Sequence, residues 1–358
     1  MPKKMTWCAG VSLLLPKKHD GLMANPTPQQ KAWLTRLRPV LPRYFPEARG
    51  QLDLRISGPP DLRTYSRLFP FTILEDGLPL TELVVKVPQG RKAADVHLAF
   101  RAHRLLETHL AEYPHLTVPR ALDAWEDPPA LIMLRVEGAP LYIRMRDCRS
   151  WAPENGCQLA RHFVWQAGRW LGVLHQLTPP RWSRPAPNPL AQREHWLLAL
   201  RAGGLDPMDE KRIRERTDVL AASAHESVPL HGDFTLRNVL CHPPQQVTVL
   251  DTELAFFGEP ALDIGWFLAA LRTIDKWQIM VGEMAYPRAV IHRTETAFLE
   301  GYQSVRTLPP QPLIQAYTTL RLLERWADFV QQEKQRNIAG LRVLVIRRIN
   351  QHFARMLP

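Results

Sequence analysis

The residues with the clearest chemical potential form a polar cluster in the second half of the chain. His231, Asp233 and Asn238 stand close together, directly before a short apolar run, 239–241, that predicts a strand. A carboxylate in such a setting can accept a proton from an attacking hydroxyl, and an amide oxygen can bind a hard cation. The cluster is therefore a candidate catalytic site.

A second set of acidic residues follows the next predicted strand. The apolar run 247–250 leads directly to Asp251, and Glu253 follows shortly after it. Because the Pro-Pro link at 243–244 is short, we predict that the two runs form a hairpin. A hairpin returns its far end to its beginning, so Asp251 is expected to lie close to Asn238.

Two oxygen ligands beside a further carboxylate suit magnesium. This cation prefers carboxylate and amide oxygens, keeps several waters and takes further ligands from nucleotide phosphates. Asn238 and Asp251 are therefore candidate Mg²⁺ ligands, and Asp233 is the candidate base. The same Asp-x-x-x-x-Asn arrangement occurs in the catalytic loop of kinases, where the Asp orients the nucleophile and the Asn binds metal.

These motifs resemble the signature of a known family. His-Gly-Asp-Phe-Thr-Leu-Arg-Asn over 231–238, followed by Leu-Asp-Thr-Glu over 250–253, is similar to the catalytic segment of the aminoglycoside phosphotransferase and choline kinase-like superfamily. The stretch 258–265 resembles that family's next segment, in which an Asp opens a helix. The resemblance implies a protein-kinase-like fold, ATP and Mg²⁺ as cofactors, and phosphoryl transfer to a small-molecule hydroxyl.

The resemblance extends to a nucleotide-binding part of the chain. Lys86, in the apolar run 83–87, resembles the strand lysine that contacts the α and β phosphates. Met133, Leu134 and Val136 resemble the hinge whose backbone pairs with adenine. The resemblance therefore implies that these four residues bind ATP.

The chain departs from the family pattern at two places. The glutamate that should pair with Lys86 is not at its usual position, since Asp95 lies too early and Glu107 too late. No Gly-x-Gly-x-x-Gly motif occurs, and only the segment 58–66 occupies the phosphate-loop position. The partner of Lys86 is thus left open.

Four residues near the candidate site have supporting roles with alternatives. His231 is expected to hold the loop by hydrogen bonds rather than to bind metal, and Asp263 is expected to cap a helix or to pin the loop backbone. Glu253 either supports the metal site or is a solvated residue at a strand end. Arg237 either contacts phosphate or an acidic substrate, or faces solvent.

The surrounding patterns predict an α+β protein of two lobes. Short strands separated by turns occupy 52–86, with Asp76-Gly77 as a hairpin turn signal between the strand-like runs 71–74 and 83–87. Helical apolar spacing predominates after Gly138. We predict a leader or disordered extension over 1–27, a nucleotide-binding N-lobe with a mainly antiparallel sheet over 28–135, and a larger helical C-lobe over 136–358. Helices are expected at 30–45, 94–112, 159–177, 191–202 and 209–224.

Composition and charge narrow the class of protein. The 358 residues are 45% apolar, enough for a sizeable core, and their net charge is +11. Of the basic residues, 36 are Arg and only 10 are Lys, and an Arg bias spread along a chain can reflect genomic base composition. The one basic cluster, 331–358, has the apolar spacing of a helix with a solvated face, so we expect no nucleic-acid partner.

The first residues loosely imitate a signal peptide. Two lysines precede the apolar run 5–15, which is shorter than the roughly 20 residues of a membrane span and lacks a cleavage site. We expect no transmembrane segment, although a weak membrane-surface anchor is an alternative reading of the run. The four cysteines form no CxxC pair and no disulfide framework, so we expect a cytoplasmic location.

The leading hypothesis is an ATP-dependent phosphotransferase that acts on a small-molecule hydroxyl. The basic segment 141–149 favours a neutral, acidic or phosphorylated acceptor over a polycationic one. The alternative is a catalytically silent nucleotide-binding or scaffold protein with the kinase fold, suggested by the unclear partner of Lys86. Asp233, Asn238 and Asp251 argue against it, because a silent relative has no chemical need of all three. The acceptor, the choice between ATP and GTP, and the oligomeric state are left open.

Overall fold

A computed structural model describes seven stretches of the chain. They are residues 26–63, 65–90, 96–148, 154–221, 226–274, 286–335 and 342–357. The chain divides into two compact units, one made of residues up to 108 together with 119–136, the other of 109–118 together with the residues from 137 onward. Within the described ranges, no helix combines the length and the apolar character that a membrane crossing needs.

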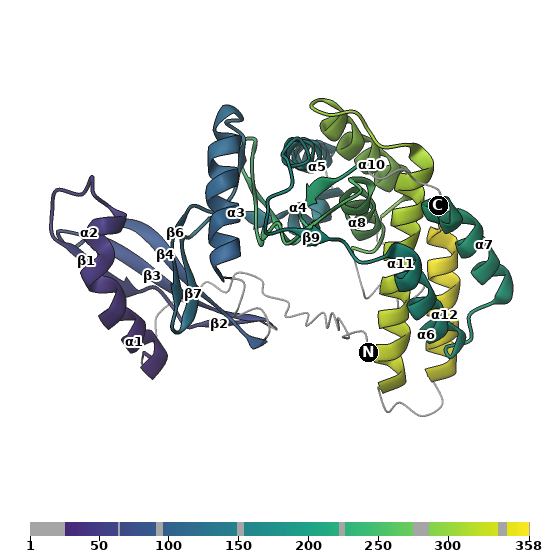
Figure 1. The fold of residues 1–358 in the computed structure, drawn as a ribbon, viewed down its shortest axis with the longest axis horizontal. Helices are drawn as coiled ribbons and strands as arrows, with labels where there is room; N and C mark the ends of the chain where they lie inside the picture. The colour runs from purple at the N-terminus through teal and green to yellow at the C-terminus, as the bar shows by residue number, and fades with distance from the viewer. Residues whose placement is uncertain are drawn as a thin grey trace. The chain divides into compact units, whose positions relative to one another are not determined.

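The first unit is built on one antiparallel sheet. Five of its six strands follow the order β1-β3-β4-β7-β6 (Figure 1). The sixth strand, β2, also pairs with β3, near the start of that strand. The predicted turn at Asp76-Gly77 joins β3 to β4, and both residues have positive φ, as a tight hairpin requires. The elements are α1 (Pro28–Leu37), η1 (Arg38–Val40), α2 (Leu41–Tyr44), β1 (Leu52–Ile56), β2 (Asp61–Leu62), β3 (Ser66–Glu75), β4 (Leu78–Pro88), α3 (Val96–His109), β6 (Ala121–Glu126) and β7 (Pro129–Leu134).

Alternating residues of β7 face opposite sides of this sheet. Ala130 and Ile132 pack with the apolar residues of α1 and α2, whereas Leu131 packs with Val96 of α3. Helices α1 and α2 therefore cover one face of the sheet and α3 covers the other. Lys86 on β4 is the cross-strand partner of Leu131, so its side chain leaves the strand on the face that α3 covers.

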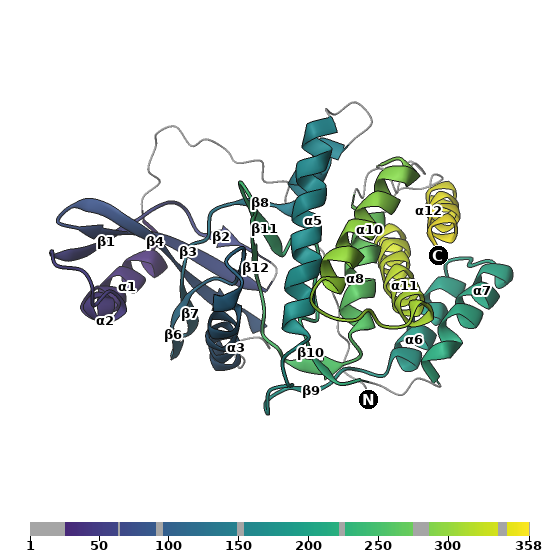
Figure 2. The same cartoon turned by 90° about the horizontal axis from the view of Figure 1, so that it is seen from above.

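The second unit is mainly helical. It also contains two small sheets, with the strand orders β5-β12-β11-β8 and β10-β13-β9, and β12 of the first sheet contacts helix α5 (Figure 2). Residues 109–118 belong to this unit because β5 pairs in parallel with β12. Its elements are η3 (Leu110–Glu112), β5 (Leu116–Thr117), β8 (Ala139–Pro140), α4 (Leu141–Met145), η4 (Arg146–Cys148), α5 (Glu154–Leu174), β9 (Arg184–Pro185), α6 (Pro189–Arg201), α7 (Pro207–Thr217), η5 (Asp218–Ala221), β10 (Val228–Leu230), β11 (Val239–His242), β12 (Gln246–Val249), β13 (Phe256–Gly258), α8 (Ala261–Arg272), α10 (Arg288–Gln303), α11 (Gln311–Gln335) and α12 (Arg342–Met356).

Helix α11 forms the centre of the helical core. It contacts α8, α6, α7 and α12, and the views in Figures 1 and 2 agree in placing α6 and α12 alongside it. Trp326 and Val330 of α11 are fully buried in a cluster with Leu200 of α6 and Phe353 of α12. This packing fixes the position of α11, which also carries Arg321, Glu324 and Arg325.

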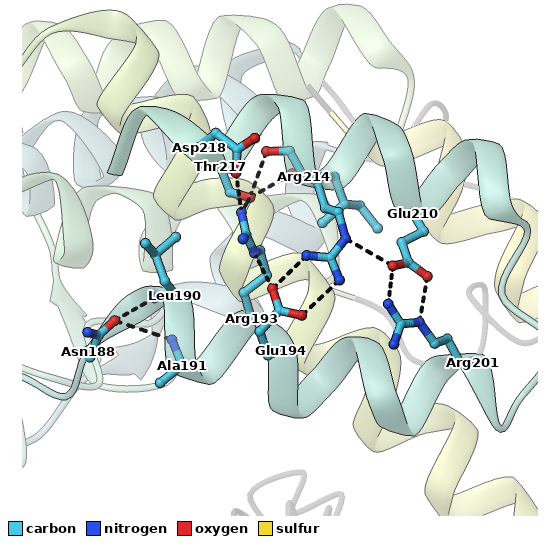
Figure 3. A network of polar contacts seen from close by, with 11 residues as sticks. Asn188, Leu190, Ala191, Arg193, Glu194, Arg201, Glu210, Arg214, Thr217 and Asp218 are labelled. Carbon is cyan, nitrogen blue, oxygen red and sulfur yellow. Dashed lines mark hydrogen bonds and ion pairs between the residues drawn. The ribbon is translucent and has the colours of Figure 1, made fainter. Parts of the chain in front are cut away.

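An ion-pair network joins α6 to α7 on the surface of the second unit (Figure 3). Arg214 donates to both carboxylate oxygens of Glu194, at 2.7 and 2.8 Å, and to Glu210 at 3.0 Å. Hydrogen bonds from Arg201 and then from Arg214 lower the pKa of Glu210 to about 2. Arg193 extends the network to Asp218 at 2.7 Å. The network joins the two helices, and its exposed members, such as Asp218 and Arg201, add little stability.

Helices α5 and α10 cross at two glycines. A Cβ at Gly301 of α10 would lie 1.9 Å from the carbonyl oxygen of Trp165, and a Cβ at Gly168 of α5 would lie 2.0 Å from the carbonyl oxygen of Phe298. Since backbone atoms occupy the space on both sides, no side chain can move aside. The two backbones approach this closely only because both positions are glycine.

We therefore expect Gly301→Ala to lower the free energy of unfolding. Overpacking costs about 1–3 kcal/mol or more, which exceeds the gain of roughly 1 kcal/mol from replacing a helical glycine by alanine. Thermal unfolding followed by circular dichroism measures the effect. Gly58→Ala is the control, because no atom lies within 4 Å of its Cβ position. An unfolding midpoint of Gly301→Ala at or above that of the wild type would contradict the close crossing.

Candidate active site

The predicted hairpin is present and brings two site residues together. Strands β11 and β12 pair antiparallel with Val239 opposite Val249. The Leu250 amide donates to the Asn238 carbonyl at 2.8 Å, which extends the pairing by one step. Asp251 follows immediately, so the expectation that it lies beside Asn238 is confirmed. Asp251 is exposed and has φ +57°, a left-handed conformation that is uncommon for a residue with a side chain.

The side chain of Asn238 is tied to Asp233. Its amide nitrogen donates to the Asp233 carbonyl at 2.9 Å and to the Asp233 carboxylate at 3.1 Å. Because the amide nitrogen donates to Asp233, the oxygen of the same amide is the atom that can coordinate a cation. Asn238 is thus suited to connect the candidate base with a metal site.

His231 uses both ring nitrogens inside the protein. Nε2 lies 3.0 Å from the Leu250 carbonyl oxygen, and Nδ1 lies 3.2 Å from the Asp233 amide nitrogen. A carbonyl can only accept and an amide can only donate, so Nε2 carries the proton and Nδ1 accepts. The ring therefore links the start of the catalytic loop to the end of β12, which favours the structural role over metal binding.

Asp263, in the first turn of α8, holds the backbone of the same loop. Its carboxylate accepts hydrogen bonds from the amides of His231 at 2.7 Å and Gly232 at 3.0 Å. Gly232 has φ +80°, and the two bonds stabilise this turn. Of the two roles open to Asp263, the structure therefore shows pinning of the loop backbone.

Two further buried residues complete the support of Asp263. His175 Nε2 lies 3.3 Å from the Asp263 carboxylate, and His175 Nδ1 lies 3.0 Å from the Tyr302 hydroxyl. Burial lowers the pKa of His175, and hydrogen bonding to Asp263 opposes that shift. The loop is therefore held by a chain of side chains from α8, from the residue that follows α5, and from α10. His175 and Tyr302 have no obvious sequence signal for this role.

The environment of Asp233 raises the pKa of its carboxyl. The main cause is burial, and the neighbouring Asp251 carboxylate adds to it, while Arg321 and His231 act in the opposite direction. A raised pKa moves a carboxylate toward the range in which it can serve as a general base near neutral pH.

Helix α11 adds residues that the sequence did not single out. Arg321 places its guanidinium carbon 3.7 Å from the ring centroid of Trp266 and pairs with Glu324. Arg325 donates to the carbonyl and hydroxyl of Thr273 at the end of α8. The available signal is the Arg-x-x-Glu-Arg spacing over 321–325, which places charged residues inside an otherwise apolar, largely buried stretch of helix.

The donor set fits a magnesium ion bound together with phosphates. Asn238 and Asp251 offer an amide oxygen and a carboxylate, and Glu253 lies half-buried just beyond them. In the described stretches, no three His, Cys, Asp or Glu side chains are grouped as a self-sufficient metal site. A cation that takes its remaining ligands from water and phosphate does not need such a group.

In the first unit, the candidate hinge residues differ in whether their backbone amides already donate hydrogen bonds within the protein. The Leu134 amide donates to the Arg120 carbonyl at 2.9 Å, and the Arg135 amide donates to the Glu82 carbonyl at 2.9 Å. Met133 lies inside the ladder, paired with both β4 and β6. Val136 lies beyond the last paired residue of β7, so its amide is the best placed of the three to donate to a base.

Glu107, one of the two considered partners of Lys86, is engaged elsewhere. Its carboxylate pairs with Arg104 at 2.8 Å and with Arg120 at 3.7 Å. Asp95, the other residue considered, lies outside the described residues. Lys86 itself occupies the sheet face that α3 covers, as described above.

The remaining basic candidates lie in different surroundings. Arg237 is exposed on the catalytic loop. Arg144, in the basic segment 141–149, lies near Cys241 of β11, where its charge acts on the thiol. The Tyr142 amide donates to the Leu236 carbonyl at 3.2 Å, so α4 is attached to the catalytic loop through its backbone.

A comparison with family models decides the family. The model described as "phosphotransferase enzyme family" matches residues 71–308, more than half of the chain. The chain belongs to this phosphotransferase family. The match spans residues 231–253 and α8, so the candidate site of this phosphotransferase lies inside the matched region.

Solved structures show that the phosphotransferase has a protein-kinase-like fold. A Ralstonia eutropha protein assigned as an aminoglycoside phosphotransferase shares 15% identity at TM-score 0.56, covering 89% of this chain and 98% of that one. A spectinomycin phosphotransferase in complex with ADP and spectinomycin shares 12% identity at TM-score 0.53, covering 89% and 96%. The choline kinase LicA of Streptococcus pneumoniae shares 11% identity at TM-score 0.50, covering 92% and 100%. No curated protein sequence matches the phosphotransferase significantly.

Proposed function

We propose that this phosphotransferase moves the γ-phosphoryl group of ATP to a hydroxyl of a small molecule. The observation that supports this most directly is the Asn238 side chain, whose nitrogen bonds to the Asp233 carboxylate, while Asp251 lies just beyond the end of the adjacent strand β12. One amide thereby couples a base to a cation site. Residues 28–135 would bind the nucleotide, and residues 136–358 would carry the catalytic loop and the acceptor site.

The nucleotide is bound by residues of the first unit. Lys86 stabilises the α and β phosphates, and the backbone at Met133, Leu134 and Val136 pairs with adenine, with the Val136 amide as donor. The spectinomycin phosphotransferase of similar fold was solved with ADP, which is consistent with an adenine nucleotide here. The choice of ATP over GTP rests on this analogy of fold.

Asp233 orients the acceptor hydroxyl and takes its proton as the oxygen attacks the γ-phosphorus in line, while the bond from that phosphorus to the β–γ bridging oxygen breaks and ADP leaves. Asn238 holds the carboxylate in place, and Asp263 and His231 hold the backbone that carries it. Such transfers depend mainly on positioning and on neutralising the charge of the phosphates. Arg237 and Glu253 have supporting roles near the phosphates and the cation.

Asn238 and Asp251 would hold Mg²⁺, which neutralises phosphate charge when it is bound. Asp251→Asn is therefore expected to raise the Mg²⁺ concentration needed for half-maximal activity by about tenfold or more, because the ligand loses its charge. Initial rates of γ-phosphate release against Mg²⁺ concentration measure this. Equilibrium binding of Mg-ADP gives a second readout that does not depend on turnover.

Glu47→Gln is a matched control, since Glu47 is an exposed carboxylate of the first unit. An unchanged Mg²⁺ dependence in Asp251→Asn would remove this residue from the metal site. If the wild type binds Mg-ADP but transfers no phosphoryl group to sugars, amino alcohols, aminoglycosides or water, the catalytically silent alternative is favoured instead.

A further inference from the structure

Resting on the proposed function, we propose that the acceptor carries an anionic group, a carboxylate or a phosphate, and that Arg321 of α11 binds it beside Asp233. This names the acceptor class that the site selects. Three features of Arg321 support the proposal: its position, its burial and a hydrogen-bond donor without a partner in the part of the chain that the structure describes.

The position of Arg321 follows from contacts that lead back to the catalytic loop. Its guanidinium stacks on Trp266 of α8, 3.7 Å from the ring centroid. The next residue, Phe267, packs against Phe234 at a centroid distance of 5.4 Å, and Phe234 directly follows Asp233. The Arg321 charge is close enough to act on the Asp233 carboxylate.

Helices α8 and α11 are held in register at this point. A Cβ on Gly265 would lie 2.6 Å from the Thr318 backbone nitrogen, so the two backbones meet where only glycine fits. Trp266 follows Gly265 directly, and Arg321 lies one turn beyond Thr318. The stacked pair is thus fixed by the packing of the helix backbones, as a recognition site requires.

Arg321 keeps an unused donor although it is almost fully buried. The residue is 9% exposed, and one terminal nitrogen pairs with Glu324. Its Nε has no hydrogen-bond partner among the described residues. A buried donor without a partner is costly, and a planar guanidinium with a donor to spare is suited to a carboxylate or phosphate oxygen.

The carboxylates around this position already have roles. They are Asp233, Asp251 and Glu324, while Arg321 and the exposed Arg237 both act on Arg325. Burial, and then the charges of these two arginines, lower the pKa of Arg325 to about 9. Asp233 and Asp251 are the proposed base and metal ligand, and Glu324 already accepts a hydrogen bond from Arg321, so a cationic group on the acceptor would compete with these roles.

A purely structural role for Arg321, packing on Trp266 and pairing with Glu324, is the competing explanation. Binding of small anions separates the two. The Mg-ADP complex of the full chain is titrated with inorganic phosphate in one arm and acetate in the other, and binding is followed by calorimetry. We expect Arg321→Gln to weaken the preferred anion by about tenfold or more. Arg321→Lys keeps the charge but loses the planar fork, so its loss should be smaller.

Arg348→Gln on α12 is the matched control, because it removes the same charge from an exposed position. The arm with the tighter binding identifies phosphate or carboxylate as the recognised group. Equal anion binding by wild type and Arg321→Gln would overturn the inference, as would a preference for neutral or aminated sugars over their acidic or phosphorylated counterparts in a transfer assay. Anion binding does not need turnover, so a lack of phosphoryl transfer would count against the proposed function and not against this site.

Discussion

Replacing Asp233 by asparagine is expected to lower kcat by roughly 10²–10⁴-fold while the fold and Mg-ADP binding stay intact. Removing a positioned general base typically costs this much. Asparagine matches aspartate in size and can still accept the 3.1 Å hydrogen bond from Asn238, so the loop should keep its shape. A coupled assay of phosphoryl transfer measures kcat, and Glu47→Gln is again the control.

The pH dependence of the wild type provides a second test of Asp233. The base must be deprotonated to act, and burial raises its pKa above the ordinary aspartate value. We therefore expect kcat/KM to fall as the pH drops through that raised pKa, and Asp233→Asn to lose this acidic limb. Equal kcat values for the variant and the wild type would show that Asp233 is neither the base nor the orienting group.

Asp263→Ala is expected to have the largest effect on stability. The change leaves three donors without an acceptor, namely the buried His231 amide, the buried Nε2 proton of His175 and the half-buried Gly232 amide. Each unsatisfied buried donor costs about 1–3 kcal/mol, so a loss of about 3–5 kcal/mol in the free energy of unfolding is expected. Chemical denaturation of the protein, followed by its helical circular dichroism signal, measures this loss.

Activity distinguishes the positioning role of Asp263 from a general contribution to packing. Where Asp263→Ala still folds at low temperature, kcat should fall with little change in the KM for ATP, since the loop loses its anchor but the nucleotide contacts remain. Tyr302→Phe is a milder companion variant. It removes only the hydroxyl that bonds to His175, so we expect a loss of about 1 kcal/mol and near-normal kcat. A stable, fully active Asp263→Ala protein would refute the anchoring role.

Asp233 and Asp263 differ in how far the sequence could predict their roles. The Asp233, Asn238 and Asp251 arrangement was predictable, because it depends on a loop and a hairpin whose geometry neighbouring residues determine. The role of Asp263 could only be narrowed to two possibilities. Its partner His231 lies 32 positions away in the chain, and only the packing of α8 brings the two together.

The helices and strands of the first unit likewise include some features that the local sequence predicts and others that it does not. Alternating apolar residues and the Asp76-Gly77 turn were sufficient to predict the β3–β4 hairpin. The predicted helix over 30–45 is present but divided into α1, η1 and α2, with a proline near the start of both following segments. Residues 109–118 were expected with the N-lobe interval, yet β5 pairs with β12, more than a hundred positions later.

The sequence by itself was enough to identify the candidate base and the candidate metal ligands, since residue types at short spacing define which groups are able to act in these ways. It also determined the family, which residues 71–308 confirm. Only the tertiary structure decided what surrounds Asp233. Arg321 and Trp266 meet because Gly265 lets α8 and α11 approach closely, a contact between distant segments that no local pattern encodes. The acceptor class depends on such contacts, because recognition requires side chains from separate helices to be held around one point.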